Sequence, residues 1–268
     1  MQALLTQAML HCRRPQMDGV WHAESGVFDV AAFGAARPGA PGTSQDVLAI
    51  VTLDVDRLVL VVADGAGGHA GGAEAAALAV EAVVDAVSET SDDRRRGAIL
   101  DGIESGNDAI LSSRSGGAST LAVAEIDRGL LRTYHVGDTE VLVTGQRGRV
   151  KHQTRNHTPV GAALEAGLIT QRAAMTHPQR HLLCNAMGVR KMWIDIGPPI
   201  EMAPRDTVLV ATDGLFDNLT SAEVVSLVCN GRIDGCVTEL ARLAARRMHG
   251  GFRISKPDDI AMLACRAS

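Results

Sequence analysis

Short runs of apolar residues, separated by glycine-rich or charged segments, recur along the chain. Runs rich in Val, Ile and Leu and bounded by such segments are typical of buried β-strands. The runs that predict strands are 28–33, 47–53, 58–63, 119–126, 130–136, 140–146, 194–196, 207–211 and 260–264. Only short turns at 127–129 and 137–139 separate three consecutive runs. Links this short predict antiparallel neighbours, because parallel strands need a long crossover.

Four segments between these runs are expected to be helical. Residues 74–87 place Leu78, Val80 and Val83 among alanines, a spacing that gives one broad buried face. The other expected helices are 95–111, 221–229, with Ser221 as a candidate cap, and 234–248. Residues 1–25 look polar and irregular. Strand runs interrupted by pairs of helices predict an α+β fold of antiparallel sheets covered by helices.

Composition narrows the class of protein. The chain has 268 residues, 46% of them hydrophobic and 21% charged, which is typical of a globular protein. The net charge of −5 and the lack of a long basic run argue against nucleic acid as a partner. Five widely spaced cysteines without a Cys-x-x-Cys pair suggest reduced thiols. With no signal-peptide pattern and no long apolar run, we expect a cytoplasmic protein that does not contact a membrane.

Acidic residues stand at the ends of several strand runs. Asp64-Gly65 and Asp213-Gly214 each follow a run, Asp258-Asp259 precedes the last run, and Asp46 precedes the run at 47–53. A carboxylate at the end of a buried strand is costly unless it is solvated, hydrogen-bonded or bound to a cation. Several such carboxylates suggest one site that holds hard cations through oxygen ligands.

The glycine cluster after residue 63 allows another interpretation. Residues 65–70 fit G-x-G-x-x-A between a strand and a helix, as in a dinucleotide-binding fold. The acidic residue expected about twenty positions later would be Asp85, which falls inside a predicted helix. The tight turns between later strands also argue against a parallel sheet. A purely structural glycine loop is a further alternative.

Several segments together resemble the metal-dependent Ser/Thr protein phosphatases of the type 2C family, in their compact bacterial form. Residues 62–69 resemble the family's V-A-D-G-M-G-G-H segment, 135–139 its V-G-D-S turn, and 209–217 its L-x-x-S-D-G-L-x-D segment. Further similar segments are 117–120, 167–170, 185–188 and 256–260. The segments cover residues 28–266 in the family's order.

The resemblance implies a fold and an activity. The fold is a four-layer αββα sandwich, in which two antiparallel sheets pack face to face with helices on the outer faces. Residues 1–268 would form a single phosphatase domain, with a flap-like segment at about 147–190. The activity is hydrolysis of phosphoserine and phosphothreonine in a phosphorylated protein substrate, in opposition to a Ser/Thr kinase.

The resemblance also implies a metal centre of two Mg²⁺ or Mn²⁺ ions, or three. Asp64 would bridge two ions, with the Gly65 carbonyl as a further ligand. Asp213 and Asp258 would hold the first ion, and Asp46 would lie beside the second. The last ligand implied, for a third ion, is Asp138. Asp64, Asp213 and Asp258 would therefore be the catalytic residues.

Structural alternatives stand beside these assignments. Asp138 could stabilise its own turn, and Asp46 could be an ordinary residue at a strand edge. Asp259 could be the ligand in place of Asp258. Asp217 is expected to cap a helix.

Two further residues have candidate roles in the reaction. His69 could donate a proton to the leaving group, although a structural role is an equal alternative. Many relatives carry an arginine that grips the substrate phosphate, at the position of Pro41 here. The nearest arginine, Arg37, could take over this contact. If it does not, the chain would be a binding or regulatory module of the same fold with little turnover.

Overall fold

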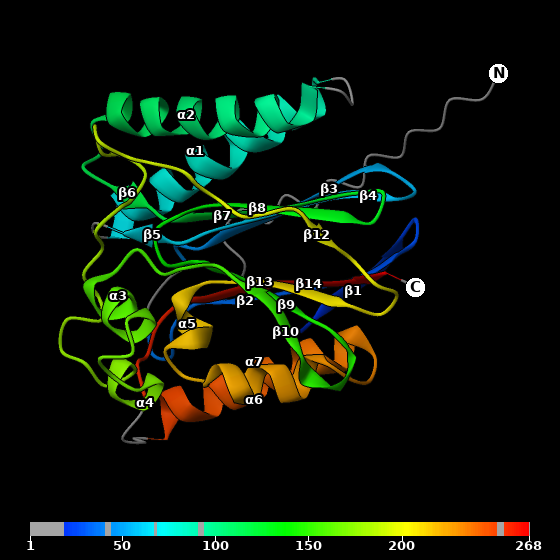
Figure 1. Cartoon of the computed structure of the whole chain (residues 1–268). Coiled ribbons are helices and arrows are strands. Elements are labelled where there is room, and N and C mark those ends of the chain that lie inside the picture. The colour runs from blue at the N-terminus through cyan, green and yellow to red at the C-terminus, as the bar shows by residue number, and fades with distance from the viewer. Residues whose placement is uncertain (1–18, 41–43, 67–68, 91–93, 251–254, 268) are drawn as a thin grey trace.

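The computed structural model describes residues 19–40, 44–66, 69–90, 94–250 and 255–267. Two antiparallel sheets stack face to face in the middle of the molecule (Figure 1). The first sheet has the order β1 (Trp21–Ser25), β2 (Phe28–Ala35), β14 (Ile260–Ala267), β13 (Thr207–Ala211), β9 (Glu140–Thr144) and β10 (Val150–Gln153). The second has the order β11 (Asp195–Ile196), β8 (Leu130–Val136), β7 (Leu121–Asp127), β4 (Arg57–Ala63) and β3 (Val47–Asp54), and β12 (Ile200–Glu201) also pairs with β8.

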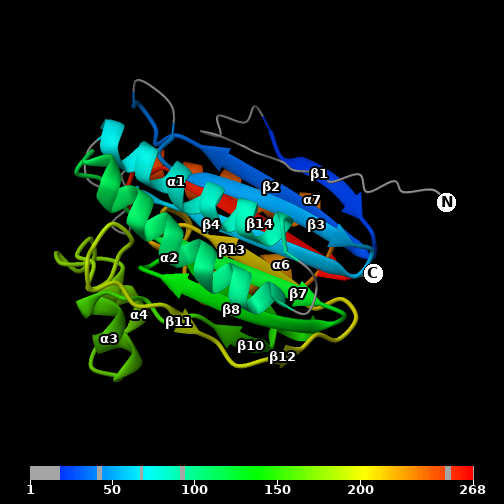
Figure 2. The ribbon, with the colours of Figure 1, turned by 90° about the horizontal axis from the view of Figure 1, so that it is seen from above.

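Helices cover both outer faces of the stacked sheets. Helices α1 (His69–Ser88) and α2 (Arg95–Ser113) lie over the second sheet, as Figure 2 shows from above. Helices α6 (Ser221–Val228) and α7 (Ile233–His249) lie under the first. The predicted four-layer αββα sandwich is therefore confirmed.

The apolar strand runs follow from this layering. Along β4, Val59 and Val61 pack toward α1 and α2, whereas Leu58, Leu60 and Val62 pack toward the other sheet. Successive side chains of a strand point to opposite faces, and here both faces are buried. A strand buried on both faces is therefore apolar throughout instead of alternating.

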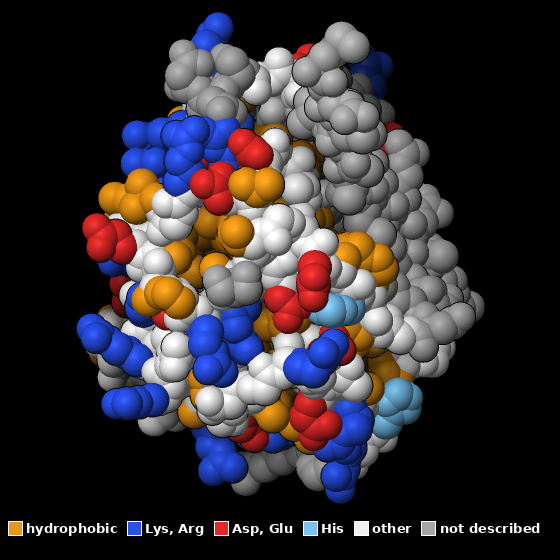
Figure 3. All heavy atoms as spheres, turned by 90° about the vertical axis from the view of Figure 1, so that its right-hand side faces the viewer, with side chains coloured by type: hydrophobic (Ala, Val, Ile, Leu, Met, Phe, Trp, Pro, Cys, Tyr) orange, Lys and Arg blue, Asp and Glu red, His pale blue; other side chains and the backbone are white. Residues whose placement is uncertain are grey.

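Among the described residues, five short elements gather at one end of the sandwich. They are the strands β5 (Gly65–Ala66) and β6 (Ala118–Ser119), which pair with each other, and the helices α3 (Pro159–Glu165), α4 (Gln171–Ala174) and α5 (Asp213–Phe216). A 3₁₀ turn, η2 (Gln146–Gly148), joins β9 to β10. The opposite end is the face seen in Figure 3, where acidic and basic side chains lie among apolar ones. Every helix in the described part of the chain is too short or too polar to traverse a lipid bilayer.

Two local predictions were wrong. Residues 21–25 form the edge strand β1, whose mostly half-exposed residues lack the apolar run that marks an inner strand. The N-cap of α6 is Thr220, which forms a capping box with Glu223, and not Ser221. Asp217 is, as expected, a cap residue: it is the C-cap of α5, where its backbone amide donates to the Asp213 carbonyl, while its side chain forms an ion pair with Lys256.

Candidate metal centre

The pairing of the strands brings distant carboxylates to one end of both sheets. Val47 pairs with Ala63, so Asp46 and Asp64 leave adjacent strands side by side. In the other sheet, Ala211 pairs with Met262, which places the end of β13 beside the start of β14. Asp213 begins α5 directly after β13, and Asp258 lies two residues before β14. Asp138 comes from the turn between β8 and β9.

The backbone around Asp64 is held by the neighbouring strand. The Asp64 amide donates to Thr120 Oγ1 at 3.2 Å, and the Asp64 carbonyl accepts from the Thr120 amide at 2.9 Å. Gly65 then packs so tightly against Gly72 that a Cβ at Gly65 would lie 2.3 Å from the Gly72 carbonyl oxygen. Close packing against Gly72 therefore requires glycine at position 65, independently of any bound ligand.

The electrostatics of the cluster favour either protonation or a bound cation. Burial raises the pKa of Asp46, Asp64 and Asp138 well above the usual range, and the neighbouring carboxylates raise it further. For Asp64 the neighbours that raise the pKa include Asp213, Asp138 and Asp258. So many buried carboxylates in one place are stable only if they are protonated or paired with positive charge.

The oxygen atoms present fit a hard divalent cation. Asp46 Oδ1 and Asp213 Oδ1 are buried without a hydrogen-bond partner. An orphaned carboxylate oxygen in such a position is available as a ligand. Carboxylate oxygens suit Mg²⁺ and Mn²⁺.

Of the two adjacent acids, Asp259 has a structural role. Asp259 Oδ1 accepts from the Arg37 amide at 2.8 Å, and Asp259 Oδ2 accepts from the Gln45 amide at 2.6 Å. The Asp259 carboxylate thus fastens two loops to the start of β14. This arrangement favours Asp258 as the ligand.

A lysine that sequence reasoning missed lies inside the cluster. Lys256 Nζ forms ion pairs with Asp213, with Asp258 at 2.9 Å and with Asp217 at 3.0 Å. These carboxylates raise the pKa of Lys256 above its usual value, although burial opposes them. Its position two residues before Asp258 was the available signal.

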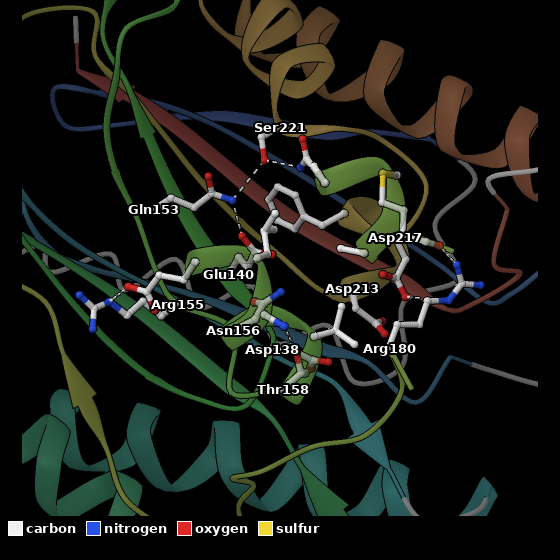
Figure 4. Close-up of a pocket in the computed structure, with 18 of the residues that line it drawn as sticks. Asp138, Glu140, Gln153, Arg155, Asn156, Thr158, Arg180, Asp213, Asp217 and Ser221 are labelled. Carbon is white, nitrogen blue, oxygen red and sulfur yellow. Dashed lines mark hydrogen bonds and ion pairs between the residues drawn. The ribbon is translucent and has the colours of Figure 1, made fainter. Parts of the chain in front are cut away.

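A cavity of about 470 Å³ opens beside the carboxylates (Figure 4). Asp138, Asp213 and Asp217 line one side, and the segment that carries α3 and α4 lines another. Figure 4 shows Arg180 at the edge next to Asp217, and the two form an ion pair at 4.0 Å. Glu140 lies deeper, where burial raises its pKa to about 7.

A second group of ligand-type side chains lies at the base of this segment. The ligand atoms of His135, His157 and Asp195 all lie within 4.8 Å of one another. However, His157 Nδ1 accepts from the Gly137 amide at 3.1 Å and from Asn185 Nδ2 at 2.9 Å. This assigns the proton to Nε2, which then has no lone pair for a metal. His157 instead fastens the segment to the Gly137 turn.

Two further candidate residues are Arg37 and His69. The Arg37 amide bonds to Asp259, so Arg37 lies beside the centre, and Arg37 is exposed. His69 begins α1, but its side chain and Pro41 lie outside the described residues.

Comparisons with known proteins agree with this geometry. The sequence profile of the family described as Protein phosphatase 2C matches residues 35–231. The Serine/threonine phosphatase stp of Listeria monocytogenes serovar 1/2a is 28% identical over 185 residues, which cover 65% of this chain and 73% of the relative. The protein phosphatase PstP of Mycobacterium tuberculosis is 26% identical over 218 residues, 76% of this chain but 39% of that protein.

Solved structures show the same fold. The M. tuberculosis phosphatase PstP/Ppp has a TM-score of 0.75 at 22% identity, over 90% of this chain and 99% of that one. The S. agalactiae serine/threonine phosphatase has a TM-score of 0.77 at 23% identity, over 90% and 100%. A PstP catalytic domain solved with two manganese ions has a TM-score of 0.72 at 21% identity, over 89% and 97%.

Proposed function

The chain belongs to the protein phosphatase 2C family, and on this premise we propose that it is a metal-dependent hydrolase of phosphoserine and phosphothreonine in proteins. The observation that carries the proposal is the convergence of Asp46, Asp64 and Asp213 at one end of two sheets. The bacterial relatives, which are Ser/Thr phosphatases by name, support the same substrate class.

In the proposed centre, each carboxylate has a defined task. Asp64 would help to hold both ions, with the Gly65 carbonyl as a further ligand. Asp213 and Asp258 would hold the first ion, and Asp46 would lie beside the second. Bound divalent ions supply a water of lowered pKa and neutralise the phosphoryl oxygens.

We assign Mg²⁺ or Mn²⁺ as the cofactor, with two ions, or three if Asp138 binds one. The donors are carboxylate and carbonyl oxygens, which favour these ions over zinc. The relative solved with two manganese ions supports the choice.

We also propose how the substrate is held. Arg37 would contact the phosphate, since its backbone is fixed next to the centre through Asp259. His69, at the start of α1, would donate the proton to the leaving alkoxide. The segment at about 147–190 would act as a flap of the single phosphatase domain, because its helices line the cavity beside Asp138 and Asp213.

The cellular setting is part of the proposal. A phosphoprotein phosphatase implies a Ser/Thr kinase that it opposes. The four described cysteines are free thiols, which supports a reducing compartment such as the cytoplasm.

The test is hydrolysis of a phosphothreonine peptide and of p-nitrophenyl phosphate, with Mn²⁺ and with a chelator. We expect Asp64→Asn and Asp213→Asn to lose at least about a hundredfold in turnover, since each removes charge from the metal centre. Asp85→Asn, on the exposed side of α1, is the matched control and should keep full activity. Wild-type protein without metal-dependent turnover would instead indicate a binding or regulatory module.

A further inference from the structure

The ammonium group of Lys256 lies where the proposed function needs a metal ion. Its ion-pair partners include Asp213 and Asp258, the two carboxylates assigned to the first ion. Lys256 is only 19% exposed at its side chain, so these contacts are largely shielded from solvent. The lysine and the ion would therefore use the same two carboxylates, on which the ammonium contacts the Oδ2 atoms.

The backbone of Lys256 is fixed, so this contact is a built feature of the site. The Lys256 amide donates to Asn218 Oδ1 at 3.0 Å, and the Lys256 carbonyl accepts from Asn218 Nδ2 at 2.9 Å. Asn218 is fully buried, and its Nδ2 also donates to the Gly214 carbonyl at 3.0 Å. One asparagine thus ties the lysine to the helix that begins with Asp213.

An ammonium and a divalent ion bound to the same carboxylates repel each other. Hydrogen bonds from an ammonium are about 2.7–2.9 Å long, whereas Mg²⁺ needs oxygens at about 2.0–2.1 Å. In the described part of the chain, the one group of three ligand atoms within 4.8 Å of one another is His135, His157 and Asp195, and not the acidic centre. The carboxylates of Asp213, Asp217 and Asp258 therefore surround the ammonium but do not all lie within 4.8 Å of one another.

We propose that Lys256 is a competitor built into the metal centre. Its ammonium holds Asp213 and Asp258 when no divalent ion is bound, and it leaves them when an ion enters. Asp217 is not one of the assigned metal ligands, so it remains as an ion-pair partner for the displaced ammonium. The lysine thereby stabilises the metal-free protein and lowers the affinity for the ion. This proposal rests on the metal role of Asp213 and Asp258.

The test is calorimetric titration of chelator-stripped protein with Mn²⁺. We expect Lys256→Met to bind Mn²⁺ about tenfold more tightly than wild type, because a positive charge next to the ligands is gone. Lys256→Arg keeps the charge and should stay within about threefold of wild type. Lys191→Met removes an exposed lysine without a described ion pair and controls for net charge. Equal or weaker binding by Lys256→Met would overturn the proposal.

Thermal unfolding gives a second measurement that does not depend on turnover. Stripped Lys256→Met should unfold at a lower temperature than stripped wild type, because its carboxylates repel one another without a cation. Saturating Mn²⁺ should close this gap. A gap that persists unchanged in Mn²⁺ would mean a purely structural lysine and would contradict the proposal. Wild type that binds Mn²⁺ as expected but hydrolyses no phosphate ester would contradict only the proposed function.

Discussion

Thr212 donates its hydroxyl proton to Asp46 Oδ2 at 2.9 Å, although 166 positions separate the two residues. Asp46 directly precedes β3 of the second sheet and Thr212 directly follows β13 of the first, so this bond joins the two layers inside the candidate metal centre. The bond lowers the pKa of Asp46 against the effects of burial and of Asp64, which raise it. Burial dominates and the pKa of Asp46 stays raised, so the Thr212 bond offsets only part of the rise at this candidate metal ligand.

Replacing Thr212 tests this relationship. Thr212→Val removes the donor, so we expect Asp46 to hold its proton more tightly and the Mn²⁺ affinity to fall by about three- to tenfold. The Ala261 amide also loses its acceptor, Thr212 Oγ1 at 3.0 Å, and unfolding should need about 1–3 kcal/mol less. Mn²⁺ titration and urea unfolding measure both effects. Thr212→Ser keeps the hydroxyl, and a serine variant as impaired as the valine variant would contradict this account.

Arg37 is the residue to test for substrate binding. If its guanidinium contacts the phosphate, Arg37→Ala should raise KM for a phosphothreonine peptide by about tenfold, the size of one charge-assisted hydrogen bond. Turnover at saturating substrate should change little. Arg37→Lys should recover part of the loss, because the charge remains and the planar fork does not. Arg149→Ala, at an exposed turn, is the control; an unchanged KM for Arg37→Ala would exclude the contact.

The fold was predictable from the sequence because its inner strands are apolar on both faces. Val59 and Leu60 pack against opposite layers, yet both belong to a single apolar run that predicts a strand. Edge strands lack this signal: residues 21–25 and 150–153 are covered on one side only, so their composition resembles that of a loop.

The gathering of acidic residues at one end of the sheets was predictable. A carboxylate at the end of a buried strand is costly unless it is solvated, hydrogen-bonded or bound to a cation. The roles of the residues around these carboxylates were not predictable. The role of Lys256 depends on where its flexible side chain points, and the role of Thr212 depends on a contact across two sheets. Neither leaves a local pattern. The difference between Asp258 and Asp259 likewise depends on which loops donate to each carboxylate.

Gly214, which follows Asp213, tests how closely the metal centre is packed. A Cβ at this position would lie 1.9 Å from the carbonyl oxygen of Asp259, and that backbone cannot move without shifting the start of β14. We expect Gly214→Ala to lower the free energy of unfolding by about 3 kcal/mol and to impair Mn²⁺ binding. Gly235 in α7 has nothing within 4 Å of its Cβ position, so Gly235→Ala should be neutral or stabilising by up to about 1 kcal/mol. Similar unfolding curves for the two variants would show that α5 is more adaptable than its contacts suggest.

Stability away from the metal centre should depend on pH through Glu223. Its carboxylate accepts from Arg247 and from the Thr220 amide, at 2.9 Å, and these bonds lower its pKa to about 2. The unfolded chain should titrate near the ordinary value of about 4.3. The folded protein therefore gains stability above this value, and the gain disappears as the pH falls from about 4 toward 2.

Glu223→Gln measures that gain. The Glu223 side chain is 41% exposed, so solvent screening limits the expected cost to about 1 kcal/mol at pH 7. Urea unfolding of wild type and variant, both stripped of metal, should show this difference at pH 7 and at pH 5. The difference should shrink as the pH is lowered further, because wild type then loses the charge that the variant never had. Glu239→Gln removes an exposed partner of Arg242 in α7 and should have no measurable effect at any of these pH values. A Glu223→Gln cost that stayed constant down to low pH would assign the stabilisation to packing instead of to the carboxylate charge.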